Sequence, residues 1–351
     1  MSDQAFNTAI CCIAKCENHY LKEWVDYHLG IGFKDIFIYD NNAIDGERIE
    51  PLFEGYEHVT ILDCRGKIMY QRPAYTDFYH RYGAVYDWIA YIDVDEFITF
   101  SESSGIHTID EFLHTFDKKE VDVIQLNWML YGDNDIVCCD SFSVLDRFVN
   151  PLPYDIKLFG GDYPQNDMVK NIYRGGLLKE NQMNTPASDW SVDPHGINGL
   201  RGLSYVDDKG ERCEGSWHKP YDFSVAYVRH YFTKTIVEWI IKKSRGRVNG
   251  NPTKWAEKYS FDTFFDVNAR TEEKERIIRC FEIFSEMLST SESNNLAFMK
   301  SFSERWDSIN KQNDAIWQRY IDISNSKEYR LGRFFLRPVS LVKSKLKRKK
   351  R

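Results

Sequence analysis

Apolar residues in the first hundred positions form short blocks that polar clusters separate. Residues 9–14 are almost entirely apolar, which predicts a buried strand, and residues 36–39 form a second block of this kind. Between them, apolar residues recur at the spacing of one helix face, and Gly30 follows as a stop signal. That face is formed by Leu21, Trp24, Val25, His28 and Leu29. The strand–helix–strand order predicts a parallel strand pair with a right-handed crossover.

A further apolar run at residues 88–92 predicts another buried strand, and Asp93 and Asp95 follow it. Side chains alternate faces along a strand, so we expect Asp93 and Asp95 to point the same way. Two adjacent carboxylates repel each other unless a positive charge lies between them, and a hard cation such as Mn²⁺ or Mg²⁺ meets that need. The alternative is an acidic, solvated turn that ends the strand.

Polar residues follow the ends of all these predicted strands. In α/β sheets with parallel strands, ligands bind at the carboxyl ends of the strands. We therefore expect one shared rim that carries Glu17, Asn18, Asp40, Asn41, Asp93 and Asp95.

The remaining chain predicts loops first and helices later. Residues 136–220 are rich in Gly, Pro, Asp and Asn, which favours loops and short strands. A strong apolar pattern returns at residues 224–241 around His230, and residues 255–323 have a helical pattern. We predict an α/β fold in which helices flank a mixed, mainly parallel sheet, with a C-terminal helical extension.

Charge is distributed unevenly along the chain. The formal net charge is -7, and residues 327–351 contain 11 Lys or Arg and one Glu, so this tail carries +10 and the remainder -17. The tail also contains apolar residues, so we expect it to bind an anionic membrane surface; a solvated end is the alternative. We expect no nucleic-acid binding, because the acidic body would repel phosphate and no recognition motif appears.

Several common signals are not found. Residues 1–4 lack a basic signal-peptide start, no run of about 18 uncharged apolar residues occurs, and the 8 Cys show no paired metal spacing. We therefore expect a cytoplasmic protein with reduced thiols. Aromatic residues make up 15% of the chain, which fits both core packing and stacking on sugar rings.

An ordered series of motifs resembles the family 2-like and family 92-like glycosyltransferases. The series starts with residues 16–18, 23–30, 39–46 and 92–97, and continues with residues 127–132, 169–170, 194–195 and 230–235, then Glu238, Lys242 and residues 245–246. The resemblance covers residues 7–250. The chain departs from the pattern at Cys16, where Arg is common, and at Tyr131, where Phe is common.

The resemblance implies a GT-A-like nucleotide-binding domain and an enzyme. The expected donor is a nucleotide sugar, namely a UDP-sugar, and the expected acceptor is a saccharide or lipid-linked saccharide in surface polysaccharide assembly. Transfer would invert the anomeric centre. The enzyme would be peripheral at the inner face of the cell membrane. The expected divisions are 1–250 for the transferase domain (1–135 the nucleotide-sugar half, 136–250 the acceptor half), 251–326 for a helical region and 327–351 for the tail.

Metal roles are assigned to two carboxylates and a histidine. Asp95 is the expected direct ligand, and Asp93 would help to hold the ion or bind the donor ribose. His230 is a candidate third ligand, with a packed core residue as the alternative. Glu96 would orient these groups or form a salt bridge.

Donor and acceptor roles fall on other residues of the rim and the later motifs. Glu17, Asp40 and Asn41 would bind the base and ribose, with turn capping as the alternative. Positive charge for the diphosphate would come from Lys234, Lys242, Lys243 and Arg245, unless they form an exposed helix face. Inversion requires a general base, and Asp193, Asp133 and His195 are the candidates, which the sequence leaves open.

Two other classes of function remain open. A phosphotransferase or phosphatase would use Asp93 as the nucleophile, although Glu96 and Phe97 fit that motif poorly. A catalytically silent saccharide-binding or scaffold protein is the second alternative.

Overall fold

The computed structural model describes residues 5–117, 119–136, 143–158, 161–178, 191–198, 202–213, 219–244 and 261–269. The chain forms two compact units. The first, here named the sheet unit, comprises Met1–Gly132, Ser143–Lys234 and Arg245–Lys258. The second, the helical unit, comprises Asp133–Phe142, Thr235–Ser244 and Tyr259–Arg351.

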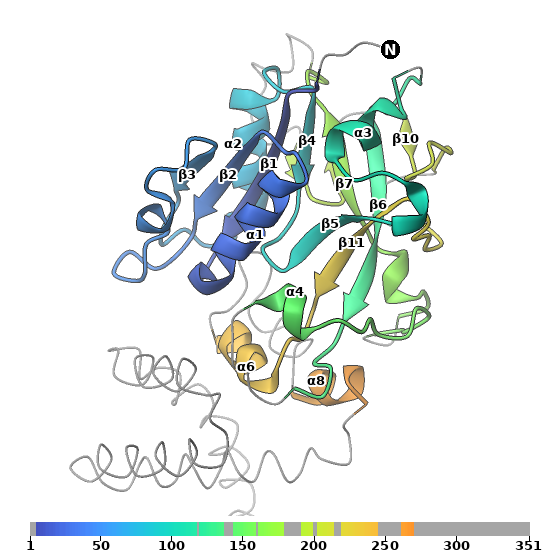
Figure 1. Ribbon diagram of the computed structural model, residues 1–351. Coiled ribbons are helices and arrows are strands. Elements are labelled where there is room, and N and C mark those ends of the chain that lie inside the picture. The colour runs from blue at the N-terminus through green and yellow to red at the C-terminus, as the bar shows by residue number, and fades with distance from the viewer. Residues whose placement is uncertain are drawn as a thin grey trace, which may run out of the picture. The chain divides into compact units, whose positions relative to one another are not determined.

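The N-terminal part of the sheet unit alternates strands and helices (Figure 1). In chain order these are β1 (Thr8–Ala14), α1 (Asn18–Gly30), β2 (Asp35–Asp40), β3 (Val59–Asp63), α2 (Gln71–Tyr82), β4 (Trp88–Tyr91), β5 (Glu96–Phe100), α3 (Ile109–His114) and β6 (Val123–Tyr131). Short 3₁₀ turns lie at Glu50–Phe53 and Glu102–Ser104. The predicted strand, helix and strand at residues 9–39 are confirmed.

The later elements of the sheet unit are shorter. They are α4 (Val144–Arg147), a 3₁₀ turn (Gln165–Asp167), β7 (Val169–Arg174), β8 (Ser191–Asp193), β9 (Gly196–Asn198), β10 (Tyr205–Val206) and β11 (Ala226–Tyr231). The helical unit contains α6 (Ile236–Ser244) and α8 (Phe261–Val267). Helix α8 lies within the helical region predicted for residues 251–326.

Nine strands form the main sheet, in the order β3-β2-β1-β4-β7-β6-β11-β5, and β10 also pairs with β6. Strands β3, β2, β1 and β4 run parallel to one another. Strand β7 is antiparallel to both of its neighbours, while β11 is parallel to β6 and antiparallel to β5. The predicted α/β class with a mixed, mainly parallel sheet is confirmed.

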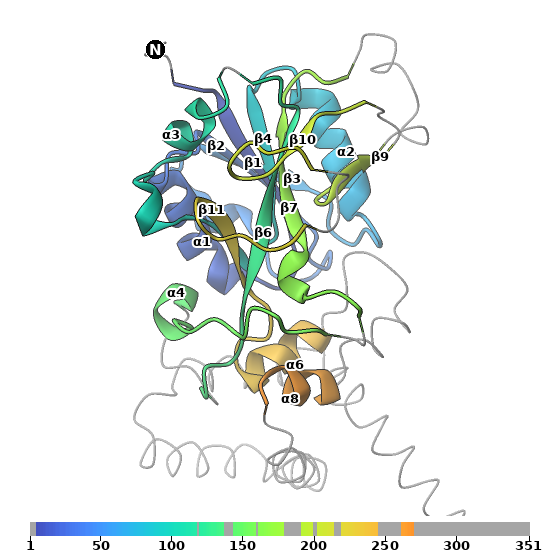
Figure 2. The ribbon, with the colours of Figure 1, turned by 90° about the vertical axis from the view of Figure 1, so that its right-hand side faces the viewer.

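Strand β7 links the two predicted halves of the transferase domain. It lies between β4 and β6, beside β6 in Figure 2, although it comes from a region where we expected only loops and short strands. Its neighbour β6 pairs with β7 through residues 123–127 and with β11 through residues 128–131. Segments from both predicted halves therefore share one sheet, and the boundary at residue 135 stays a prediction.

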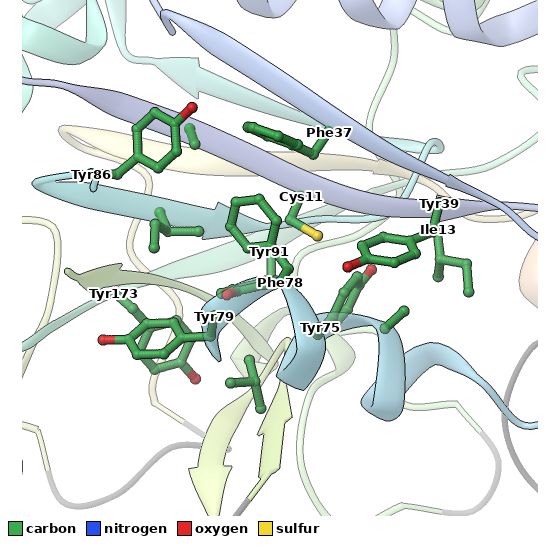
Figure 3. Close-up of a cluster of buried hydrophobic side chains, with 14 of the residues drawn as sticks. Cys11, Ile13, Phe37, Tyr39, Tyr75, Phe78, Tyr79, Tyr86, Tyr91 and Tyr173 are labelled. Atoms are coloured by element: carbon green, nitrogen blue, oxygen red, sulfur yellow. The ribbon is translucent and has the colours of Figure 1, made fainter. Parts of the chain in front are cut away.

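Helices cover both faces of the sheet. Tyr75, Phe78 and Tyr79 of α2 pack with the core residues of β1 and β2 that point to that face, such as Cys11 and Phe37 (Figure 3). Helix α1 contacts β2 and β5, where its Trp24 indole donates a hydrogen bond of 2.7 Å to the Glu96 carbonyl. Many of the aromatic residues noted in the composition thus serve core packing.

Strand β4 ends two residues before Asp93, so both carboxylates of the acidic motif lie in a turn. The Asp93 amide donates to Glu96 Oε2 (2.9 Å), and the Glu96 amide donates to the Asp93 carbonyl (3.0 Å). After this turn the chain enters β5, which pairs with β11. The expectation that strand alternation orients Asp93 and Asp95 is therefore wrong, because the turn sets their directions.

Some predictions fall on parts of the chain that the structure does not describe. Arg245, the tail 327–351 and most of residues 251–326 lie outside the described residues. Within the described part, no helix combines the length and apolar character that a membrane crossing requires.

Candidate functional site

The loops that follow β1, β2 and β3 are joined at the carboxyl edge of the sheet. The Asn41 amide donates to the Ala14 carbonyl (2.9 Å), and the Cys16 amide donates to Asn42 Oδ1 (2.6 Å). The Cys64 amide in turn donates to the Asp40 carbonyl (3.0 Å). The turn with Asp93 and Asp95 follows β4, which is parallel to β1, so it belongs to the same edge. The structure thus contains the predicted rim.

Asp40 and Asn41 hold the shape of this rim. Asp40 Oδ1 accepts from the Asn42 amide (3.0 Å) and Oδ2 from the Ile49 amide (3.1 Å). The Asn41 side-chain amide donates to the carbonyls of Cys64 (3.0 Å) and Lys67 (2.9 Å). These are the turn contacts of the structural alternative, and the predicted donor contacts of both residues stay predictions.

Glu17 and Asn18 lie where the rim meets α1. Glu17 is buried, and its carbonyl accepts from the Tyr20 amide (2.9 Å) at the start of the helix. The Asn18 side chain donates to the Arg48 carbonyl (3.0 Å), which connects α1 to the loop after β2. Both residues are therefore placed at the predicted edge.

A buried lysine binds the first carboxylate of the acidic motif. Lys170 of β7 is only 1% exposed, and its Nζ lies 2.8 Å from Asp93 Oδ2 and 3.0 Å from Glu96 Oε2. Gln71 of α2 donates to Asp93 Oδ1 (2.9 Å). Both oxygens of Asp93 are thus hydrogen-bonded, and the positive charge beside it is an ammonium group.

Burial sets the electrostatics of this group. It raises the pKa of Glu96, and the nearby Asp93 and Asp95 add to this effect although Lys170 opposes it. Burial also raises the pKa of Asp93, but the Lys170 ammonium outweighs it and holds that pKa below the ordinary value. The same two carboxylates keep the pKa of Lys170 above its ordinary value despite burial. Lys170 is therefore charged at neutral pH.

The second carboxylate of the motif lies beside His230 and Lys234. Asp95 Oδ2 is 3.8 Å from His230 Nε2 and 4.0 Å from Lys234 Nζ. His230 pairs with Glu96 across β11 and β5, and the Tyr231 amide donates to the Asp95 carbonyl (2.9 Å). The structure therefore brings together Asp95, His230 and Lys234, which the sequence had placed in separate motifs.

The donor atoms of Asp95 and His230 fit a divalent cation. A carboxylate oxygen and an imidazole nitrogen 3.8 Å apart can both bind one ion, since each metal bond is about 2.1 Å long. Asp93 instead contacts Lys170 and Gln71. Within the described ranges, no three His, Cys, Asp or Glu side chains are grouped to hold a metal ion. The metal roles of Asp93, Asp95 and His230 therefore stay predictions, and the geometry favours Asp95 and His230.

Trp128 connects two histidines of the candidate site. Its ring centroid lies 4.4 Å from that of His230 and 5.5 Å from that of His195, and Lys170 Nζ lies 5.9 Å from the ring. The Trp128 Nε1 is buried and has no hydrogen-bond partner within the described part of the chain. An indole donor in this position can bind a ligand oxygen.

Asp193 and His195 lie at the turn of the β8–β9 hairpin. Arg72 of α2 donates to Asp193 Oδ2 (2.6 Å), and Asp193 Oδ1 accepts from the His195 amide (2.8 Å). His195 Nδ1 bonds to the Val169 carbonyl, which only accepts, so Nδ1 carries the proton of the neutral ring. Burial, assisted by the Lys170 charge, lowers the pKa of His195 to about 4. His195 is therefore neutral at pH 7.

The third candidate base belongs to the helical unit. The Asp133 amide donates to Asn268 Oδ1 (2.7 Å), and Asp133 Oδ1 accepts from the Asp135 amide (3.0 Å). Lys242 and Lys243 lie on α6 of the same unit. The roles of these three residues stay predictions.

The sequence interpretation assigned no role to Lys170, Gln71, Arg72 or Trp128. Lys170 and Trp128 lie within motifs quoted for the family resemblance, which was the available signal. Gln71 and Arg72 open α2, and no motif marks them. Their contacts depend on strand order, which local patterns do not reveal.

Comparisons with known proteins agree with the resemblance drawn from these motifs. Residues 8–147 match the family model described as Glycosyltransferase family 92. The resemblance is thereby confirmed for this part of the chain, whereas the motifs beyond residue 147 lie outside the match. Lys170, His195 and His230 belong to that later part.

Two plant proteins and one solved structure are among the similar proteins. A family 92 protein of Oryza sativa subsp. japonica is 29% identical over 119 residues, 33% of this chain and 20% of that protein. One of Ricinus communis is 34% identical over 91 residues, 25% of this chain and 16% of that protein. The chain thus matches about a fifth of the length of these relatives or less. The structure of S. aureus TarS has a TM-score of 0.34 and 13% identity, covering 93% of this chain and 92% of that one.

Proposed function

We propose that the protein is a metal-dependent glycosyltransferase that moves a sugar from a nucleotide-sugar donor to a saccharide acceptor. The observation that carries the proposal is the meeting of Asp95, His230 and Lys234 within 4.0 Å at the carboxyl edge of the sheet. This edge lies in large part within the residues that match family 92. The acidic turn and the cationic side chain suit a ligand that combines a metal ion and a diphosphate.

Donor binding falls to the residues around the acidic turn. Asp95 and His230 would hold Mn²⁺ or Mg²⁺, which as a Lewis acid stabilises the charge on the departing diphosphate. Lys234 adds a positive charge beside Asp95 for the same diphosphate. Asp93, which Lys170 and Gln71 hold in place, accepts a hydrogen bond from a donor hydroxyl.

His195 is the general base of the proposed reaction. Its neutral ring keeps the Nε2 lone pair, because the Val169 carbonyl binds the Nδ1 proton. Nε2 takes the proton from the acceptor hydroxyl while that oxygen forms the new bond to the anomeric carbon. Asp193 is bound to Arg72 and shapes the hairpin turn that presents His195. Direct displacement of this kind inverts the anomeric centre.

The finer parts of the proposal rest on the family resemblance. They are a UDP-sugar donor, a saccharide or lipid-linked saccharide acceptor, and a place in surface polysaccharide assembly. They also include a cytoplasmic location at the inner face of the cell membrane, to which the +10 tail at residues 327–351 binds.

The alternative of an Asp93 nucleophile fits the geometry less well. A phosphoryl acceptor needs a nucleophilic carboxylate oxygen, and the hydrogen bonds from Lys170 and Gln71 lower the nucleophilicity of both oxygens of Asp93. No specific contact favours a catalytically silent scaffold.

A panel of nucleotide sugars tests the proposal. The purified protein is incubated with UDP-, GDP- and dTDP-sugars, with Mn²⁺ or with EDTA, and release of the nucleotide is measured. We expect one donor class to be hydrolysed with Mn²⁺ and to raise the melting temperature, because a ligand of the folded state stabilises it. Neither hydrolysis nor stabilisation by any donor would contradict the proposal.

A further inference from the structure

Strand β11 directs a second set of polar side chains away from the candidate site. His230 points to Trp128, so Arg229 and Tyr231, its neighbours along the strand, point to the opposite face. That face also carries Tyr27 of α1, since the rings of Tyr27 and Tyr231 both pack edge-on against Phe97, at 5.2 and 5.5 Å. Figure 1 shows β11 between β5 and β6 in this part of the sheet.

Arg229 is half-buried and has no carboxylate partner among the residues that the structure describes. It forms no ion pair with any residue that the structure describes, and its Nε is buried without a hydrogen bond in that same part of the chain. By contrast, Arg72 pairs with Asp193 and Arg81 with Asp77. Removing a guanidinium from water without a counter-charge is unfavourable, so an anion that binds there gains a strong interaction.

Tyrosine hydroxyls lie around this guanidinium. Burial raises the pKa of Tyr27, Tyr131 and Tyr231, and the positive charge of Arg229 opposes this rise in each of them. All three hydroxyls therefore lie near the guanidinium. A hydroxyl can donate to a carboxylate or phosphate oxygen, and a guanidinium can do so through two parallel N–H groups. The Tyr27 hydroxyl already donates to the Ile98 carbonyl and the Tyr131 hydroxyl to Met129 Sδ. The donors for one anionic group are therefore the Arg229 guanidinium and the Tyr231 hydroxyl, which has no hydrogen-bond partner among the described residues.

An exposed strip of aromatic rings leads to Arg229. Tyr154 is 44% and Tyr221 37% exposed. The centroid of Phe223 lies 5.1 Å from that of Tyr154, 5.5 Å from that of Tyr221 and 5.5 Å from that of Tyr227. Tyr227 is on the same face of β11 as Arg229, two residues away. The faces of such rings suit the C–H faces of sugars.

We propose that this strip and Arg229 form a binding site for a saccharide that carries a carboxylate or phosphate group. The ring of the sugar stacks on Tyr154 and its neighbours, and the anionic group binds Arg229 and the Tyr231 hydroxyl. A neutral sugar would leave the guanidinium unpaired, and a free anion would leave the aromatic strip unused. The site lies across β11 from His230, so it is separate from the donor site. It would hold a distant part of the acceptor if the proposed transfer is correct, but binding does not require transfer.

A glycan microarray tests this proposal. The array carries neutral oligosaccharides, oligosaccharides that contain uronic acids, and oligosaccharides that carry phosphate, and the full chain is applied in EDTA so that metal-dependent donor binding does not contribute. We expect binding to concentrate on the two acidic classes. The best-binding probe is then titrated in solution, with inorganic phosphate as a separate ligand.

Matched variants locate the binding on the surface. Arg229→Gln should weaken binding of the acidic probe at least about tenfold, because a charge-assisted hydrogen bond is lost. Tyr154→Ala should weaken it about threefold to tenfold through lost stacking. The control Arg81→Gln, which alters an exposed arginine of α2, should bind as the wild type does.

Thermal unfolding of each variant separates binding from folding. Tyr154 is exposed, so its variant stays folded and tests the site even if Arg229→Gln is unstable. Equal binding of neutral and acidic glycans, or unchanged binding by Tyr154→Ala, would overturn the proposal. Inorganic phosphate that binds as tightly as the glycan, and independently of Tyr154, would also overturn it. Loss of donor hydrolysis in Asp95→Asn with intact glycan binding would distinguish this site from the transferase site.

Discussion

Lys170 Nζ lies 2.8 Å from Asp93 Oδ2, which connects the middle strand β7 to the acidic turn after β4. The pair exists because β7 enters the sheet between β4 and β6. Lys170 is buried and also bonds to Glu96, so one ammonium group compensates two carboxylates. The arrangement of the acidic turn therefore depends on a residue that lies 77 positions later in the chain.

Replacing Lys170 should destabilise the protein strongly. Lys170→Met leaves buried Glu96 and Asp93, whose side chain is 35% exposed, without their partner, which costs about 2–4 kcal/mol in the free energy of unfolding once solvent screening of Asp93 is included. Urea unfolding at pH 7 measures this, and Lys22→Met is the matched control because Lys22 is exposed on α1. Adding Glu96→Gln to Lys170→Met should recover part of the loss. A loss below about 1 kcal/mol would show that the pair contributes little.

His28 should make stability depend on pH. Its Nδ1 donates to the Trp24 carbonyl, its Nε2 accepts from the Ile98 amide, and burial lowers its pKa to about 3. The unfolded chain therefore binds a proton below about pH 6.5 that the folded state does not, and stability falls as pH decreases toward 3.

The expected contribution of His28 is about 2 kcal/mol between pH 7 and pH 5. Chemical unfolding of wild type and His28→Gln at the two pH values measures it. The variant should be less stable at pH 7 but should lose less stability on acidification. Equal pH dependence of the two proteins would mean that His28 is not held neutral.

His195 should affect transfer more than metal binding. His195→Gln removes the proposed base, so kcat for transfer to an acceptor should fall about 10²- to 10⁴-fold. Mn²⁺ affinity should not change, because Asp95 and His230 bind the ion in the proposed site. The exposed residue His58 provides the control variant His58→Gln. Transfer by His195→Gln at the wild-type rate would exclude His195 and return attention to Asp193 and Asp133.

The tail should bind anionic vesicles. Residues 327–351 carry +10, and each basic residue near an anionic surface contributes about 1 kcal/mol, which salt screens. Sedimentation with vesicles of phosphatidylserine and phosphatidylcholine, for the full chain and for a chain ending at residue 326, measures this. Binding should weaken as salt increases and should require the tail. Equal sedimentation of both chains at low salt would identify a solvated end.

Local sequence patterns revealed the early strands, helix α1 and the shared rim. Apolar blocks such as residues 9–14 suffice for this, because their burial depends mainly on their own composition. The same reasoning placed Asp95 and His230 in one site only through the family resemblance. Their proximity comes from the pairing of β11 with β5, which joins residues far apart in the chain.

Two features of the site could not be predicted from local patterns. Strand alternation was applied to Asp93, but β4 ends at Tyr91 and a turn stabilised by Glu96 follows. Lys170 lies in a segment whose Gly and Pro content predicted loops and short strands, and that pattern did not reveal that the short strand β7 lies in the middle of the sheet. The turn at Asp93 and the central position of β7 both depend on strand order, which contacts across the whole sheet determine.

Metal-dependent donor hydrolysis by Asp95→Asn tests the central claim most directly. Asn keeps the shape of Asp95 but removes the charge that a divalent cation needs, so hydrolysis with Mn²⁺ should fall by at least about 100-fold while the melting temperature stays near the wild-type value. Asp26→Asn, at an exposed carboxylate on α1, should retain full activity. Hydrolysis by Asp95→Asn near the wild-type rate, with the same dependence on Mn²⁺, would contradict the proposed site.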